Sequence, residues 1–197
     1  MLKARVKYIK MIFLLLSILI ISESALAQQP KRSYNIVFTS VSKVEYNKDY
    51  FEYYWVGLES YNDTTKTLNW EFVLLKDYPK STWIKVESYE SMDSQFKKGV
   101  YVMDMDLCDY FDSDTLVVED MKSLSNKGME CPIPTGFHEM KNYLVNTDRY
   151  PSELPGENWM FSLTLYEKHD TKSQSDNIPK EDIIVNYKVF VLIERDF

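Results

Sequence analysis

The chain has 197 residues and a formal net charge of −7 at pH 7, with 30 acidic and 23 basic residues. An acidic chain without a basic cluster is unsuited to binding nucleic acid and to electrostatic docking on anionic membranes. Its 15 Tyr and 10 Phe against only 5 Gly and 7 Pro exclude collagen-like and disordered chains, and its length suits one domain with a substantial core.

The first 27 residues have the pattern of a secretory signal peptide. Four basic residues precede an uncharged apolar run, Met11 to Ile21, and Ala25-Leu26-Ala27 fits an A-x-A cleavage site. The run has 11 residues, whereas a membrane-spanning helix needs roughly 20, so an uncleaved anchor is the weaker alternative. Cleavage removes four basic residues and one acidic residue, which changes the net charge from −7 to −10. We expect a signal peptide over residues 1–27, a single domain over residues 28–197, and a secreted, extracellular protein.

Four segments rich in β-branched and aromatic residues follow, separated by breaks that contain Asn, Asp and Pro, and they predict β-strands. The segments are Tyr34–Tyr46, Tyr50–Tyr61, Lys66–Lys76 and Lys80–Tyr89. Their succession predicts a meander in which each strand pairs with the next. Alternate positions give a more apolar face to three of them, while the second has aromatic residues on both faces. The apolar faces contain Ile36 and Phe38, then Trp70, Phe72 and Leu74, then Ile84 and Val86.

Asn62-Asp63-Thr64 forms an N-x-T acceptor sequence in the predicted turn between the second and third strands. In a secreted chain such a turn would tolerate a glycan. We therefore predict glycosylation at Asn62, with chance occurrence of the triplet as the alternative.

The chain has two cysteines, Cys108 and Cys131. In an exported protein two thiols predict a disulfide between them. From Asp104 to Ser125 the strand pattern is lost, and short helices alternating with turns fit better. The disulfide would hold this irregular segment in place.

Strands resume at Lys141–Thr147, Asn158–Lys168 and Ile184–Arg195. In the last two, apolar residues alternate with more polar neighbours. About seven such strands indicate an all-β protein, a two-sheet antiparallel β-sandwich with short helical segments in the disulfide-closed region.

Three motifs lie between Asp106 and Phe161. They are Cys108-Asp109, then Cys131-Pro132 followed by Gly136-Phe137, then Leu154-Pro155-Gly156 ahead of an aromatic-rich strand. Together they resemble the ganglioside-activator-like branch of the ML lipid-recognition domains, and in particular the insect chemosensory-B proteins. The resemblance implies an ML/immunoglobulin-like sandwich that binds a lipid-like molecule. Ganglioside-activator proteins have several disulfides, whereas this chain keeps one pair of cysteines.

The apolar faces of a sandwich form a closed core if the sheets meet, and line a cavity if the sheets are held apart at one edge. Alternation alone favours a closed core, and the resemblance favours a cavity. The residues expected to line that cavity are Trp70, Phe72, Leu74, Ile84, Val86, Trp159, Phe161 and Leu163.

Two functions remain open. The first is non-enzymatic binding or presentation of a lipid-like hydrophobic small molecule, which the resemblance places in chemosensation, in taste or pheromone detection. The alternative is an extracellular co-subunit or interaction module with a closed core that docks on a membrane receptor, a channel or a hydrolase.

Catalytic and metal-binding motifs are missing from the sequence. There is no G-x-S-x-G, no Gly-rich phosphate loop and no H-E-x-x-H. A nucleophile pairing Cys131 with His138 would need a free thiolate, which a disulfide removes. An EF-hand frame that starts at Asp104 has Asp109 instead of Gly at position six and Thr115 instead of Glu at position twelve. We expect no catalytic residue, no cofactor and no metal.

Overall fold

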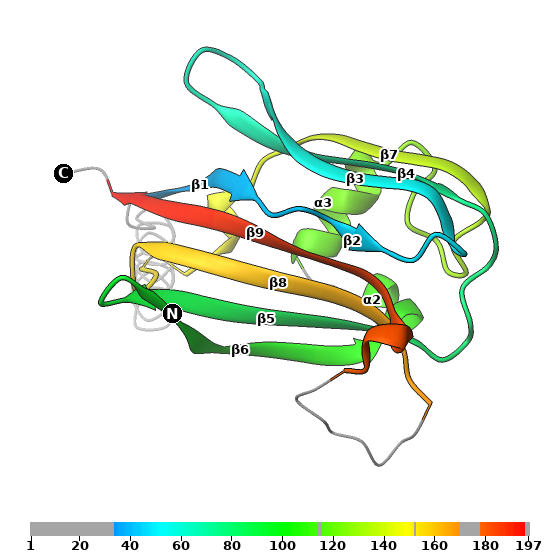
Figure 1. Ribbon diagram of the computed structural model, residues 1–197. Helices are drawn as coiled ribbons and strands as arrows, with labels where there is room; N and C mark the ends of the chain where they lie inside the picture. The colour runs from blue at the N-terminus through cyan, green and yellow to red at the C-terminus, as the bar shows by residue number, and fades with distance from the viewer. Residues whose placement is uncertain (1–33, 114–115, 152, 170–177, 196–197) are drawn as a thin grey trace, which may run out of the picture. The chain divides into compact units, whose positions relative to one another are not determined.

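A computed structural model describes residues 34–113, 116–151, 153–169 and 178–195 (Figure 1). The predicted signal peptide over residues 1–27 and the predicted domain start at residue 28 lie outside this part of the chain. Residues 34–197 form one compact unit. None of the helices in the described segments has the length and apolar composition needed to cross a membrane.

The unit contains two antiparallel sheets, as predicted (Figure 1). The larger sheet has the order β1-β9-β8-β5-β6, and the short β2 also pairs with β9. Its strands are β1 (Tyr34–Val41), β2 (Glu45–Tyr46), β5 (Thr82–Met92), β6 (Gln95–Asp106), β8 (Asn158–Glu167) and β9 (Ile183–Arg195). The smaller sheet has the order β3-β4-β7, from β3 (Phe51–Ser60), β4 (Lys66–Leu74) and β7 (Gly136–Tyr143).

Alternation along the strands places their apolar residues between the sheets. In β9, Val185, Tyr187 and Val189 are buried, while Lys188 between them is exposed. In β3 a register shift between Phe51 and Tyr53 brings Phe51 to the inner side, where it is 1% exposed. A bulge of this kind adds one residue and reverses the side-chain direction, so Phe51 is buried although simple alternation assigns it to the outer face.

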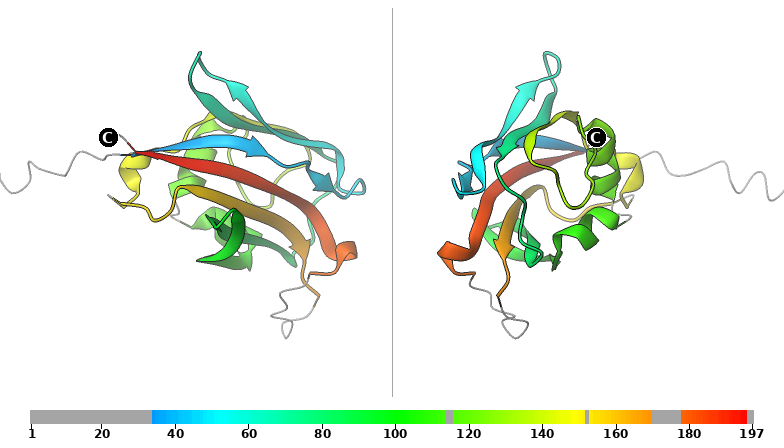
Figure 2. Two further views of the ribbon diagram at one scale, coloured as in Figure 1. Left: turned by 60° about the vertical axis from the view of Figure 1, so that its left-hand side comes forward. Right: turned by 90° about the vertical axis from the view of Figure 1, so that its right-hand side faces the viewer.

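The two long edges of the sandwich differ. Along one edge β1 contacts both β3 and β4, so the sheets approach each other there. Along the other edge two helices, α2 (Leu107–Asp112) and α3 (Leu116–Leu124), lie between β5 and β6 of the larger sheet and β7 of the smaller one. Figure 2 shows both helices on this side of the molecule. The predicted helices after Asp104 are therefore present, and they hold the two sheets apart. Two short 3-10 helices, η1 (Thr147–Arg149) and η2 (Lys180–Asp182), precede β8 and β9.

The predicted meander is wrong. Only the second and third predicted strands, now β3 and β4, pair with each other, while β1 pairs with β9, and β5 lies between β8 and β6. The segment between Leu74 and Thr82 takes the chain from the smaller sheet to the larger one. Alternation looks the same in either sheet, so the sequence did not show this crossing.

One strand was missed and another was misplaced. β6 pairs with β5 through a two-residue turn at Asp93 and Ser94, both with positive φ, as in a type I′ hairpin. It lies at the edge of its sheet and most of its residues are exposed, which explains why no alternation marks it. β7 begins at Gly136, five residues before the predicted start at Lys141, because the turn after Cys131 leads directly into the strand.

Candidate functional site: an apolar cavity between the sheets

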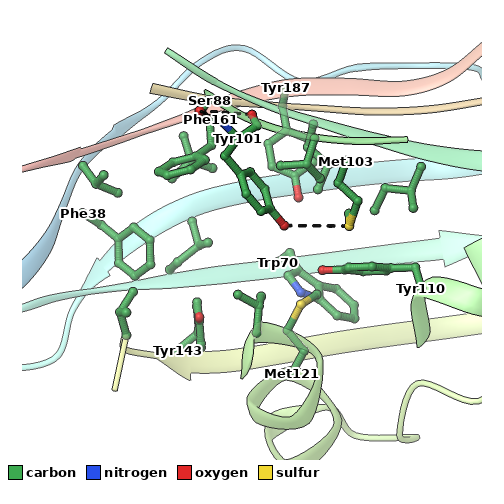
Figure 3. A pocket seen from close by; sticks show the side chains of 18 of the residues that line it. Phe38, Trp70, Ser88, Tyr101, Met103, Tyr110, Met121, Tyr143, Phe161 and Tyr187 are labelled. Carbon is green, nitrogen blue, oxygen red and sulfur yellow. Dashed lines mark hydrogen bonds between the residues drawn. The ribbon is translucent and has the colours of Figure 1, made fainter. Parts of the chain in front are cut away.

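A cavity of about 710 Å³ lies between the two sheets. Both sheets, both α-helices and the segment between β7 and β8 contribute to its lining (Figure 3). Sites for small molecules are typically mostly apolar and about 300 to 1,000 Å³ in volume, so this cavity has the size of a ligand site.

Seven of the eight residues predicted to line a cavity do so. They are Trp70 and Phe72 on β4, Ile84 and Val86 on β5, and Trp159, Phe161 and Leu163 on β8. The eighth, Leu74, is a correction: it is 1% exposed and is not part of the lining. It lies at the end of β4, between Phe51 on β3 and Gly136 on β7, and fills the packed end of the sandwich. Whether these residues contact a ligand stays a prediction.

The helices supply cavity residues that the sequence analysis did not name. Leu107, Tyr110 and Phe111 come from α2, and Val117 and Met121 from α3. Their i, i+3, i+4 spacing in α2 and i, i+4 spacing in α3 is the signal of an inward helix face. That signal could have identified them once the segment after Asp104 was predicted to be helical.

The cavity reaches the surface beside the edge strand β6. Of its lining residues there, Val100 is 98% exposed and Tyr101 is 49% exposed. Pro155 and Trp159, which also line the cavity, lie beside this opening. The Trp159 indole donates a hydrogen bond from Nε1 to the Pro155 carbonyl oxygen at 3.0 Å. A Cβ at Gly99 would lie 3.1 Å from that indole, so β6 and the start of β8 are in close contact here.

Ser88 shapes this opening. Three residues of β6, Gly99 to Tyr101, oppose Ser88 alone on β5, which makes a large bulge. The buried Ser88 hydroxyl donates to the Tyr101 carbonyl oxygen at 3.1 Å and accepts from the Tyr101 amide at 3.2 Å. These two bonds satisfy backbone groups that the bulge leaves without strand partners. The Tyr101 ring then extends into the cavity, with its hydroxyl 3.8 Å from the Met103 sulfur (Figure 3).

The cavity carries no charge on any lining residue that the structure describes, since none is Asp, Glu, Lys, Arg or His. Tyr54 and Tyr187 share a hydrogen bond deep in the lining, and burial raises the pKa of both hydroxyls above the ordinary value. Burial likewise raises the pKa of Tyr110 and of Tyr143, both of which also line the cavity. All four phenols are therefore neutral at physiological pH.

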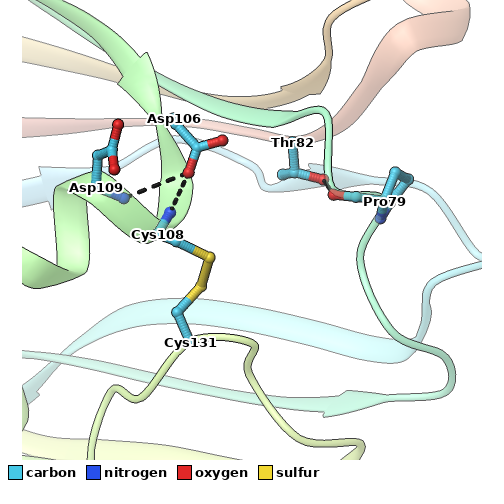
Figure 4. The surroundings of a disulfide bond; sticks show 6 residues. All are labelled: Pro79, Thr82, Asp106, Cys108, Asp109 and Cys131. Carbon is cyan, nitrogen blue, oxygen red and sulfur yellow. Dashed lines mark hydrogen bonds between the residues drawn. A yellow bond between two sulfur atoms is a disulfide. The ribbon is translucent and has the colours of Figure 1, made fainter.

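The disulfide between Cys108 and Cys131 is present, as predicted, with its Cα atoms 5.3 Å apart (Figure 4). Cys108 lies in the first turn of α2, and the Asp106 carboxylate caps that turn by accepting from the amides of Cys108 at 2.8 Å and Asp109 at 3.3 Å. Because α2 carries cavity-lining residues, the disulfide fixes one wall of the cavity to the loop that precedes β7.

The same disulfide leaves Cys131 without the free thiolate that a nucleophile paired with His138 would need. His138 is 2% exposed, stacks on Phe72 at 4.9 Å between ring centroids, and its Nε2 lies 2.6 Å from the Pro134 carbonyl oxygen. Burial lowers its pKa, the hydrogen bond to Pro134 opposes this shift, and the Lys127 charge adds to it. His138 is therefore held neutral, and its Nε2 donates to the Pro134 carbonyl oxygen.

The described segments contain no group of three or more His, Cys, Asp or Glu residues placed to hold a metal ion. The acidic run that begins at Asp104 is divided between β6 and α2, and Asp106 in it is used as a helix cap. Asn62, the predicted glycosylation site, lies in the exposed turn between β3 and β4. Its Oδ1 accepts from the amides of Thr64 and Thr65, and its modification stays a prediction.

Residues 84–161 match a family described as Protein of unknown function (DUF1091). This family is related to the ML domains. The matched span runs from β5 into β8 and includes both helices, the disulfide and the opening of the cavity. No curated protein matches the chain. The relation to ML domains that the motifs between Asp106 and Phe161 indicated is thus supported, without assignment to a branch.

Proposed function

We propose that the protein is a secreted, non-enzymatic carrier that binds a lipid-like hydrophobic small molecule between its two sheets. The observation that carries this proposal is the uncharged, largely hydrophobic cavity of about 710 Å³. Burying apolar ligand surface in such a space is favourable by roughly 25 cal/mol for each Å² removed from water. The signal-peptide pattern at the N-terminus and the disulfide support export, because disulfides persist in oxidising compartments.

The biological setting of the proposal follows from the motifs. Cys108-Asp109, Cys131-Pro132 and Leu154-Pro155-Gly156 resemble those of the ganglioside-activator-like branch, and within it the chemosensory-B proteins. We propose the same setting here, detection of tastants or pheromones, in which the loaded carrier presents its ligand to a membrane receptor or channel.

The second candidate is the extracellular interaction module. The observation in its favour is a set of exposed hydrophobic residues along β6, an edge strand in the described part of the chain: Phe96, Val100, Tyr101 and Val102. Such an edge can pair with another protein. This candidate assumed a closed core, whereas a cavity lies between the sheets. The carrier is therefore the better supported function.

A cavity-filling substitution tests the carrier. Leu163 lies on the central strand β8, faces the cavity and is half-buried. Leu163→Trp should occupy ligand volume and weaken binding of a fluorescent hydrophobic probe at least tenfold, without loss of thermal stability. Thr164→Trp, on the opposite face of the same strand, is the matched control and should bind the probe like the wild type. Absence of probe binding to the wild type, or equal binding by Leu163→Trp, would contradict the carrier and favour the interaction module.

A further inference from the structure

The polar groups that line the cavity are mostly tyrosine hydroxyls, since seven of the lining residues are tyrosines. The other polar side chains of the described lining are not open to a ligand. The buried Ser88 bonds to the backbone of Tyr101, and the Trp159 indole donates to the Pro155 carbonyl oxygen. The Trp70 Nε1 is enclosed by its neighbours. A ligand that needs a polar side chain as its partner therefore meets a tyrosine.

Five of the seven tyrosines are already bonded or partly exposed. Tyr54 and Tyr187 share a hydrogen bond, and the Tyr101 hydroxyl donates to a methionine sulfur at 3.8 Å. Tyr78 and Tyr150 are partly exposed. These five hydroxyls do not need a bond from a ligand.

Tyr110 and Tyr143 are the remaining pair, and both are buried. Tyr110 is 7% exposed and Tyr143 is 5% exposed, and neither hydroxyl has a hydrogen-bond partner among the described residues. The side-chain atoms of these segments that are both fully enclosed and unpartnered are Trp70 Nε1 and Asn186 Oδ1. The two hydroxyls therefore keep accessible surface, and because both residues line the cavity, a molecule inside it can reach them.

The two rings come from different elements, Tyr110 from α2 and Tyr143 from the end of β7. Figure 3 shows the Tyr110 hydroxyl directed into the space between the cavity side chains. Packing holds both rings, since Tyr110 contacts Phe111 at 5.6 Å and Tyr143 contacts Phe38 at 5.7 Å between centroids. Burial is the main cause of the raised pKa of Tyr143, and Tyr110 is near enough to raise it further. The pair thus forms one polar region in an otherwise hydrophobic wall.

The chemistry of this region limits what can bind there. A phenol hydroxyl can donate to an ester or ketone oxygen, and can donate to or accept from an alcohol. A hydrocarbon would cover both hydroxyls without offering a bond, which is unfavourable. A carboxylate can accept from a phenol as well, but the described lining has no Lys, Arg or His to offset the loss of its hydration. A neutral oxygen forms the bond without that cost.

We infer that the ligand carries a neutral oxygen on its apolar chain, and that this oxygen bonds to the hydroxyl pair of Tyr110 and Tyr143, between α2 and β7. Long-chain esters, ketones and alcohols belong to this class, and hydrocarbons do not. The inference rests on the proposed carrier function and adds the chemical class and the orientation of its ligand.

The test measures displacement of a bound fluorescent hydrophobic probe by methyl laurate and by tridecane, which have equal numbers of carbon atoms. In the double variant Tyr110→Phe, Tyr143→Phe, which keeps both rings, the affinity for methyl laurate relative to tridecane should fall about three- to tenfold, the range expected for one hydrogen bond. The control Tyr166→Phe should keep the wild-type ratio, because the Tyr166 hydroxyl bonds to Asp104 and Tyr166 is not part of the lining.

Infrared spectroscopy gives a second readout that the wild type alone provides. The ester carbonyl band of bound methyl laurate should lie at lower wavenumber than in an alkane solvent, because its oxygen accepts a hydrogen bond. In the double variant the band should return toward its position in the alkane.

Three results would each overturn the inference and leave the carrier intact. They are an unchanged affinity ratio in the folded double variant, an unshifted carbonyl band in the wild type, and tighter binding of laurate than of methyl laurate at neutral pH. Failure of the probe and of every ligand to bind the wild type would instead overturn the carrier function and the inference with it.

Discussion

At the scale of single residues, the wall of the cavity depends on aromatic stacking around Phe72. Tyr54, Trp70 and His138 each stack on this ring, at centroid distances between 4.9 and 5.2 Å. His138 is the imidazole of this group, and because burial lowers its pKa it is held in the neutral form. Its protonation would place a charge behind the cavity wall.

This arrangement predicts a pH dependence. Burial lowers the pKa of His138 below the ordinary value of 6.5 that it has in the unfolded chain. The unfolded state therefore binds the proton first, and stability is complete above pH 6.5 and decreases as the pH falls through the folded-state pKa. The free energy of unfolding, measured by urea denaturation above and below pH 6.5, should decrease on the acidic side.

The variant His138→Phe keeps a ring for stacking and removes the titrating group. Its stability should be lower than that of the wild type at neutral pH, because the bond to Pro134 is lost. Its dependence on pH over the same interval should be flatter. Identical pH profiles for the two proteins would show that His138 does not cause the effect.

Residue patterns predicted most of the inward faces. Alternation alone was sufficient for Trp70, Phe72 and the inner residues of β8 and β9. It did not identify the orientation of Phe51, because a bulge adds a residue to β3. It also did not identify the position of Leu74, because β4 extends beyond the cavity that it lines. Both depend on pairing partners far away in the sequence.

At the scale of secondary-structure elements, the open edge of the sandwich depends on α2. This helix has six residues, too few for stability on its own, and it is held by the Asp106 cap and by the disulfide at Cys108. It contributes Tyr110 and Phe111 to the cavity. The disulfide is thus expected to affect ligand binding as well as stability.

Replacing both cysteines by alanine tests this expectation. The bridge joins residues separated by 23 positions, and in the chain-entropy model closing such a loop stabilises the folded state by about 3 kcal/mol. The melting temperature should fall, and the affinity for a hydrophobic probe should fall as well, because one wall of the cavity loses its attachment. A wild-type melting curve that does not respond to reductant, together with two titratable thiols in the native protein, would rule out the bridge.

The strands differ in how clearly the sequence predicts them. The long central strands β8 and β9 were placed within about a residue, because both are rich in alternating apolar side chains. The edge strand β6 was missed, since most of its residues are exposed and its turn uses Asp93-Ser94 instead of the usual Gly-containing pair. The pairing of β1 with β9, from opposite ends of the domain, is a long-range contact that local sequence does not show.

At the scale of the whole described unit, the two sheets meet along β1 and are separated by helices along β6 and β7. This asymmetry produces the cavity. The sequence could not decide between a closed core and a cavity, because inward residues such as Val86 and Phe161 have the same spacing in both. The separation is set by α2, α3 and the disulfide, whose positions depend on the complete fold.

The carrier function requires that the space between the sheets hold a lipid-like molecule. Native mass spectrometry of the mature protein secreted from eukaryotic cells, followed by denaturation and organic extraction, tests it most directly. A carrier should show a stoichiometric adduct of lipid-like mass that leaves on unfolding and is recovered in the organic phase. A protein that shows only its own mass, even after exposure to lipid mixtures, would contradict the carrier function.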